Sequence, residues 1–246
     1  MSDGRRAATV HFPISLFILN QPPTGMSMPF SYPSLQQELA ATAQHLATVL
    51  PPPAAQTIDA GIAAVQAAGL VQHSLRPGQL APNFTLPDAA GQPVSLTELL
   101  AGGPVVLVFY RGNWCPYCSV QLRAYDQALA QFETYGATLV AISPQTPDLT
   151  QRTAEEKELH FPVLSDVGNQ VARQYGLAYR VGDTVYEMLQ SVGIDLHAHN
   201  GDDSGELPLT GTFVIGTDGY IAWASTEANF KQRPDPALIV AALAQL

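Results

Sequence analysis

The stretch Val105-Val106-Leu107-Val108-Phe109-Tyr110-Arg111-Gly112-Asn113-Trp114-Cys115-Pro116-Tyr117-Cys118 joins an apolar run to the only two cysteines of the 246-residue chain. Residues 105–110 are rich in β-branched and aromatic side chains, as expected of a strand whose sheet is covered on both faces. Residues 111–113 break this run, and Pro116 suits the first turn of a helix, where its missing N–H is not needed. The sequence therefore predicts a buried strand that leads through a short loop into a helix.

The predicted helix carries both cysteines near its start. Its apolar residues fall on one face: Leu122, Tyr125, Leu129 and Phe132. Cys115 is expected at the helix N-terminus, where unpaired amides and the helix dipole favour a thiolate. We therefore expect the pKa of Cys115 to lie below the free-thiol value of about 8.5. Cys118 lies about one helical turn further along and can reach back to close a disulfide.

Two other interpretations of the cysteine pair are weaker. Two cysteines cannot complete a four-ligand zinc site, and the chain has no second Cys-x-x-Cys motif. A structural disulfide would stabilise the chain more by closing a long loop than by closing a two-residue gap. The pair therefore favours redox chemistry over metal binding or a chemically silent role.

The composition argues against several classes of function. The net charge of −10, with two lysines and scattered acids, disfavours a nucleic-acid or anionic-membrane partner. No apolar stretch approaches the roughly 18 residues of a membrane span. Residues 12–19 loosely resemble a signal peptide, but Pro13 interrupts them and no Ala-x-Ala site follows. Because the only cysteines form a vicinal redox motif, we expect a reducing, cytoplasmic location.

Three parts are expected along the chain. Residues 1–33 show no period and form an irregular leader. Residues 34–74 form a helical appendage of two amphipathic helices, the first capped by Ser34 and ended by prolines at 51–53. Residues 75–246 form the main domain, with a mostly polar insertion at about 180–208. The apolar faces of the appendage helices should either cap the main domain or build a homodimer through residues 34–70.

Short strands alternate with helices in the main domain. Hairpins are predicted around Ala90-Gly91 and Thr217-Asp218-Gly219, because turn residues separate short strand patterns there. The remaining expected elements are a buried strand at 137–143, a helix from 147 to about 160, a short strand at 161–164, a helix at 169–175 and a final helix at 236–246. Alternating βα units that end in a hairpin and a helix predict an α/β sandwich with a mixed sheet.

This pattern resembles the thioredoxin fold, and more closely the alkyl-hydroperoxide-reductase and thiol-specific-antioxidant (AhpC/TSA) family of peroxiredoxin-like redoxins. Three stretches carry the resemblance: Gly78-Gln79-Leu80-Ala81-Pro82-Asn83-Phe84-Thr85-Leu86, Phe161-Pro162-Val163-Leu164-Ser165-Asp166 with Tyr175-Gly176-Leu177, and Gly211-Thr212-Phe213-Val214-Ile215. The helices at 34–70 look like the leader of a subgroup with an Arg-Gly-x-Trp-Cys-Pro-x-Cys motif. The resemblance implies a thioredoxin-like three-layer sandwich with a central mixed sheet, preceded by an N-terminal helical pair.

The resemblance also implies a function. The protein is expected to be a thiol-dependent peroxidase that reduces hydrogen peroxide and organic hydroperoxides. Cys115 thiolate attacks the peroxide and becomes a sulfenic acid, Cys118 condenses with it, and a thioredoxin- or glutaredoxin-type protein reduces the disulfide. No organic or metal cofactor is needed. Arg111 is expected to hold the thiolate, and Trp114, Thr210 and Thr212 to contact the substrate.

The chain departs from the family pattern at the site itself. Typical members place Pro-x-x-x-Thr-x-x-Cys before the reactive cysteine, and counting back from Cys115 those positions hold Val108 and Gly112. They also supply an arginine on a late strand, where this chain has Thr210. Cys-Pro-Tyr-Cys is moreover the glutaredoxin tetrapeptide. A disulfide oxidoreductase of the thioredoxin or glutaredoxin type therefore stays open as an alternative, as does a non-catalytic redox sensor.

No metal site is predicted. Asp195, His197 and His199 superficially resemble metal ligands. In a polar, glycine-rich insertion, however, a His-x-His pair is more often part of a solvated loop.

Overall fold

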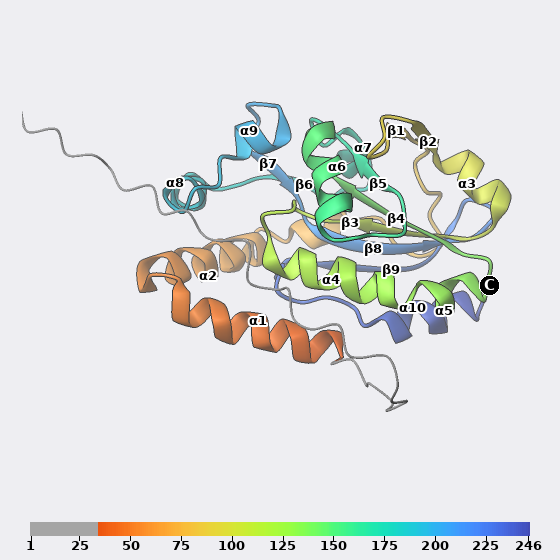
Figure 1. Cartoon of the computed structure of the whole chain (residues 1–246), viewed down its shortest axis with the longest axis horizontal. Coiled ribbons are helices and arrows are strands. Elements are labelled where there is room, and N and C mark those ends of the chain that lie inside the picture. Colours follow the sequence, from red (N-terminus) through yellow and green to blue (C-terminus); the bar gives the residue numbers. More distant parts are fainter. Residues whose placement is uncertain (1–33) are drawn as a thin grey trace, which may run out of the picture.

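A computed structural model describes residues 34–246, and the leader predicted at 1–33 lies outside the described residues. A five-stranded mixed sheet forms the centre of the molecule (Figure 1). Its strands run in the order β5 (Val163–Ser165), β4 (Thr138–Ser143), β3 (Val105–Phe109), β8 (Thr210–Ile215) and β9 (Ile221–Glu227). β3 is parallel to β4 and antiparallel to β8. The predicted buried strand is thus the central strand, and all five of its residues are buried.

Helices and a hairpin cover the two faces of this sheet. On one face pack α4 (Pro116–Gln127), α5 (Leu129–Glu133) and α10 (Pro236–Leu243). The other face is covered by the hairpin of β1 (Thr85–Pro87) and β2 (Pro93–Ser95), by α3 (Leu96–Gly102) and by α7 (Gln170–Gln174). α6 (Pro147–Glu156) packs beside β5. The predicted α/β sandwich with a central mixed sheet is confirmed.

The two appendage helices pack against the rest of the chain. α1 (Leu35–Val49) begins at Ser34, whose side chain accepts a hydrogen bond from the Gln37 amide in a capping box. It packs along α4 and buries Leu35 and Leu39 there. α2 (Pro52–Ala67) begins directly after Pro51 with prolines in its first turn, and a 3₁₀ turn at Leu70–His73 follows it. The boundary between appendage and main domain stays a prediction.

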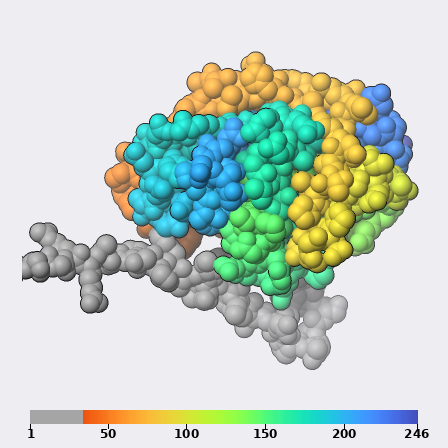
Figure 2. Space-filling model, turned by 90° about the horizontal axis from the view of Figure 1, so that it is seen from above, coloured from red at the N-terminus to blue at the C-terminus, as the bar shows by residue number. Residues whose placement is uncertain are grey.

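The insertion has a more apolar interior than predicted. β6 (Ala178–Arg180) and β7 (Glu206–Pro208) pair as a short ribbon that encloses α8 (Asp183–Ser191) and α9 (Leu196–Asn200). A small core joins this segment to α2: Ala54, Val181, Met188, Leu189, Leu196 and Leu207. Figure 2 shows the insertion, in cyan to blue, as a continuous part of the surface. The expectation of a mostly polar insertion was wrong about its interior, because amphipathic helices bury one side and expose the other.

Several predicted boundaries differ from the structure. α3, which begins directly after β2, was not predicted. The predicted single helix after the cysteines breaks at Ala128 into α4 and α5. α6 ends at Glu156 rather than near residue 160, and Glu158 then adopts a positive φ of 50°. These are differences at element ends, where sequence patterns define boundaries least well.

Candidate active site

The two cysteines lie where the central strand passes into α4. Cys115 is the N-cap residue of α4, and Cys118 lies in its first turn. A buried glutamine from the end of the adjacent strand β4 holds the intervening loop, because the Asn113 amide donates a 2.7 Å hydrogen bond to Gln145 Oε1. Gln145 in turn donates to Thr153 on α6 at 3.2 Å. The loop that presents the thiols is therefore fixed by side chains of two neighbouring elements.

Both thiols are free and buried. Cys115 is 1% exposed and Cys118 is 0% exposed, so neither sulfur is the more accessible one. The two thiols are close enough to affect each other's pKa: their interaction raises the pKa of Cys115 and lowers that of Cys118. This contact brings together the pair that a disulfide would join.

Arg111 is buried and packs against the rings of two half-buried aromatic residues. Its guanidinium carbon lies 3.8 Å from the centre of the Phe230 ring and 4.9 Å from that of Trp114. Such stacking stabilises a desolvated cation. Among residues 34–246, neither Arg111 Nε nor Trp114 Nε1 has a hydrogen-bond partner, although both atoms are buried. Two N–H donors are thus available beside the thiols.

A second buried arginine, which the sequence did not predict, contacts a thiol directly. Arg233 Nη2 lies 3.4 Å from Cys118 Sγ. The Arg233 side chain also donates to Gln121 Oε1 at 2.7 Å and to the Phe230 carbonyl oxygen. Its own carbonyl oxygen accepts a 2.9 Å hydrogen bond from Gln36 on α1. Arg233 therefore contacts both α1 of the appendage and Cys118 of the redox pair.

The predicted threonines lie on the sheet face that carries the thiols, but their hydroxyls already have partners. Thr212 Oγ1 accepts a 3.4 Å hydrogen bond from Gln121, the residue that also holds Arg233. Thr210 Oγ1 donates to the Glu227 carbonyl oxygen at 3.5 Å. A role of these hydroxyls in substrate contact stays a prediction.

The prediction of a lowered pKa at Cys115 is wrong for this geometry. Burial raises the pKa of Cys115 well above its ordinary value, and the hydrogen bond to Cys118 raises it further. Although burial alone would also raise the pKa of Cys118, the Cys115 hydrogen bond, the Arg233 charge and the Arg111 amide together lower it well below the ordinary value. The helix terminus does not help Cys115, because its side chain accepts no capping hydrogen bond.

Comparison with known proteins identifies the family. The model of the AhpC/TSA family matches residues 77–224. The chain belongs to the AhpC/TSA family. Relatives of this AhpC/TSA protein include a putative peroxiredoxin of Mycobacterium tuberculosis, which is 37% identical over 153 residues covering 61% of this chain and 84% of the relative. Chloroplastic peroxiredoxin Q of Gentiana triflora is 37% identical over 100 residues, covering 41% of this chain and 46% of the relative.

Solved structures show the same fold at lower identity. The crystal structure of peroxidoxin BcpB from Mycobacterium tuberculosis matches with a TM-score of 0.56 at 24% identity, covering 70% of this chain and 98% of that one. Xanthomonas campestris peroxiredoxin Q matches with a TM-score of 0.51 at 17% identity, covering 70% and 96%. The AhpC/TSA protein spans about half the length of the chloroplastic relatives it matches.

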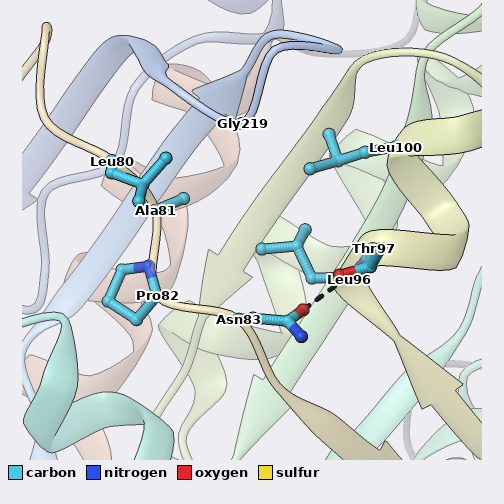
Figure 3. A pocket seen from close by; sticks show the side chains of 8 residues that line it. All are labelled: Leu80, Ala81, Pro82, Asn83, Leu96, Thr97, Leu100 and Gly219. Carbon is cyan, nitrogen blue, oxygen red and sulfur yellow. Dashed lines mark hydrogen bonds between the residues drawn. The ribbon is translucent and has the colours of Figure 1, made fainter.

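A pocket elsewhere on the AhpC/TSA protein does not contain reactive groups. It has a volume of about 430 Å³ and lies near the β8–β9 turn, at the opposite end of β3 from the cysteines (Figure 3). Its lining is largely aliphatic: Leu80, Ala81, Pro82, Asn83, Leu96, Thr97, Leu100 and Gly219. The Asn83 carboxamide oxygen already accepts a 3.2 Å hydrogen bond from the Thr97 amide. The thiol pair therefore remains the candidate site.

The described residues offer no metal centre beside the thiols. Within residues 34–246, no group of three or more His, Cys, Asp or Glu side chains could hold a metal ion. Asp195 instead caps α9 by accepting from the amides of His197 and Ala198. In the same range no helix is long and apolar enough to cross a membrane.

Gly112 determines where the Trp114 indole can lie. Its φ is +147°, and a Cβ added there would come within 2.5 Å of Trp114 Nε1. We expect Gly112→Ala to displace the indole from Arg111 and to lower the free energy of unfolding by about 1–3 kcal/mol. Tryptophan fluorescence in a Trp223→Phe background would report the displacement, because Trp114 is then the only tryptophan. An unchanged emission spectrum and an unchanged melting temperature would contradict the prediction.

Proposed function

We propose that this AhpC/TSA protein is a thiol-dependent peroxidase that reduces hydrogen peroxide and organic hydroperoxides. The observation that carries the proposal is the buried pair Cys115 and Cys118, which lies beside Arg111 and Arg233. A thiolate is the nucleophile that peroxide cleavage requires, and buried cations favour its charged form. The peroxiredoxin names of the relatives support the same activity.

The proposed reaction consumes two thiols per peroxide. One thiolate attacks a peroxide oxygen, so that an S–O bond forms while the O–O bond breaks and the leaving oxygen takes a proton. The second thiol attacks the resulting sulfenic acid, which forms the Cys115–Cys118 disulfide and releases water. Arg111 and Trp114, whose buried N–H donors have no partner in the part of the chain that the structure describes, would stabilise the charge that develops on the peroxide oxygens.

The Cys-Pro-Tyr-Cys tetrapeptide supports a second candidate, disulfide exchange with other proteins. A mixed disulfide with a protein requires a sulfur that a large partner can approach. Both sulfurs are buried, and a peroxide, being far smaller than a protein, would need a much smaller displacement of the surrounding side chains to reach them. Burial therefore favours the peroxidase over the oxidoreductase and over a sensor that docks partners by its thiols.

The remaining parts of the proposal concern partners and place. We propose a thioredoxin- or glutaredoxin-type protein as the reductant, acting on a disulfide made accessible by local opening, in a reducing cytoplasm. A homodimer through residues 34–70 would have to use the outer sides of α1 and α2, because Leu35, Leu39 and Ile62 are already buried within the chain. Light scattering of the purified protein would test the dimer.

Titration of the reduced protein tests the activity. Each equivalent of hydrogen peroxide or cumene hydroperoxide should remove two thiols and yield an intramolecular disulfide. With cumene hydroperoxide, one molecule of cumyl alcohol should appear for each molecule of peroxide consumed. A glutathione mixed disulfide should react much more slowly. If the mixed disulfide oxidised the pair rapidly and the peroxides did not, the protein would be a disulfide oxidoreductase.

A further inference from the structure

The contacts of the two sulfurs differ in a way that assigns their roles. We propose that Cys118, rather than Cys115, is the thiol that attacks the peroxide, and that Arg233 is the catalytic residue that keeps it a thiolate. Cys115 is then the proton donor and the resolving thiol. The inference reverses the roles expected from the sequence and rests on the proposed peroxidase function.

Arg233 is held so that its charge faces Cys118. The guanidinium belongs to a residue that is only 5% exposed, and its other N–H groups are bound by Gln121 Oε1 and by the carbonyl oxygens of Phe230 and Gln232. In residues 34–246, no carboxylate lies within ion-pair distance of Arg233. A buried cation without an acidic partner is costly, and a thiolate at Cys118 supplies the missing negative charge.

Cys115 lacks the equivalent support. As the N-cap residue it could accept amide hydrogen bonds from the helix, but its side chain accepts none, and the next residue, Pro116, has no N–H. The interaction with Cys118 raises the pKa of the Cys115 thiol and lowers that of Cys118, which is the pattern expected of a neutral thiol beside a thiolate. Because the two sulfurs are equally buried, exposure gives Cys115 no advantage.

The other ionisable groups around the pair do not change this assignment. Burial raises the pKa of Tyr110, Tyr117 and Tyr179, so these phenols are neutral near pH 7 and compete for neither cation. Burial lowers the pKa of Lys157, whose remaining charge would favour a thiolate at either sulfur. The charges of Arg111 and Arg233 lower the pKa of both thiols, but only Cys118 contacts Arg233 Nη2 directly and has the backbone N–H of Arg111 as a donor.

The roles give a complete reaction sequence. Cys118 thiolate attacks the peroxide, the O–O bond breaks, and the departing alkoxide takes the proton of the adjacent Cys115 thiol. Cys115 thiolate then attacks the sulfur of the Cys118 sulfenic acid, the S–S bond forms, and the hydroxide that leaves is protonated by solvent to water. Sulfur is oxidised and peroxide is reduced by two electrons, and the thiol that holds its proton more tightly is the one positioned to deliver it.

Single-cysteine variants test the assignment in two ways. A pH titration needs no peroxide, and a labelling experiment follows the reaction with peroxide. The ultraviolet absorbance of the thiolate should titrate well below pH 8.5 in Cys115→Ser, where serine still donates to Cys118, and not in Cys118→Ser. After peroxide, dimedone should label Cys118 in Cys115→Ser and leave Cys115 in Cys118→Ser largely unlabelled. A low thiolate pKa and fast labelling at Cys115 would overturn the proposal. If peroxide oxidised neither variant although Cys118 titrated low, the peroxidase function would fail while the thiolate assignment stood.

Arg233 variants separate a charge effect from a folding effect. A thiol without activation is only a few per cent thiolate at pH 7, so Arg233→Gln should slow Cys118 oxidation there by roughly 20- to 30-fold. The loss should disappear near pH 10, where both proteins are fully ionised, and Arg233→Lys should restore part of the rate. Arg123→Gln is the matched control, because the Arg123 side chain is 41% exposed on α4, the helix that carries Cys118. A slowdown that persists at high pH would overturn the proposal, because it would mean that Arg233 does not act by keeping Cys118 ionised.

Discussion

Replacing Arg111 by glutamine is expected to slow peroxide oxidation of the thiols by on the order of a hundredfold, which is typical of losing one preorganised donor to a developing anion. Arg111 is 4% exposed, lies between the Phe230 and Trp114 rings, and has a buried Nε–H without a partner in the described range 34–246. This geometry fixes the cation and leaves one N–H available for a peroxide oxygen. Stopped-flow measurement of the oxidation of the pre-reduced protein by excess peroxide would give the rate directly.

The pH profile distinguishes this role from thiolate stabilisation. If Arg111 acts mainly on the breaking O–O bond, the slowdown should persist at high pH, where the thiol is ionised without help. Arg111→Lys keeps the charge but loses the planar guanidinium, and an intermediate rate is expected. The thermal transition of each variant serves as the folding control. A rate within about twofold of the unchanged protein at every pH would remove Arg111 from the mechanism.

Deleting residues 1–70 should cause aggregation. The deletion removes α1 and α2. Loss of α1 exposes the side of α4 on which Leu35 and Leu39 pack. Loss of α2 exposes the apolar residues of the insertion that surround Ala54. It also removes the Gln36 hydrogen bond to Arg233. Newly exposed apolar patches of this kind promote association. Size-exclusion chromatography and dye binding would detect it, and a truncated protein that stays monomeric with an unchanged melting temperature would refute the prediction.

Point variants of α1 provide a graded version of the same experiment. Leu39 is 5% exposed, so Leu39→Ala should lower the free energy of unfolding by about 2–4 kcal/mol. Val49 is 42% exposed on the same helix, so Val49→Ala should lower it by less than about 1 kcal/mol. Equal losses in the two variants would show that α1 contributes helix propensity rather than packing.

Local sequence patterns were sufficient for the central part of the fold. The apolar run at 105–110 predicted a strand covered on both sides, and it is the middle strand of the sheet. Ser34 predicted the start of α1, since a capping side chain and its partner are close in sequence. Helix 183–191 was not predicted, because its apolar face is matched by residues of α2 that are more than a hundred positions away.

The active-site errors have the same physical origin. The helix-terminus argument for Cys115 depends on neighbours in sequence, but burial and distant groups determine which thiol ionises. Arg233 follows the last strand, and only the fold brings it to Cys118 over a separation of 115 residues. The chain has Thr210 where typical family members have a late-strand arginine. The site nevertheless contains a cation beside the thiol, because Arg233 occupies that place. A lone arginine before Pro234 in a chain with few charges was the only available signal.

The packing of α2 on α8 limits how this protein can be recombined with its relatives. A Cβ at Gly61 on α2 would lie 2.7 Å from a methyl carbon of Val185 on α8, so the two helices approach too closely for a larger side chain at that position. The family match at 77–224 includes the insertion but not the helical pair. A chimera that takes either segment alone would expose half of a shared core, and so the helical pair and the insertion must be transplanted together as one unit.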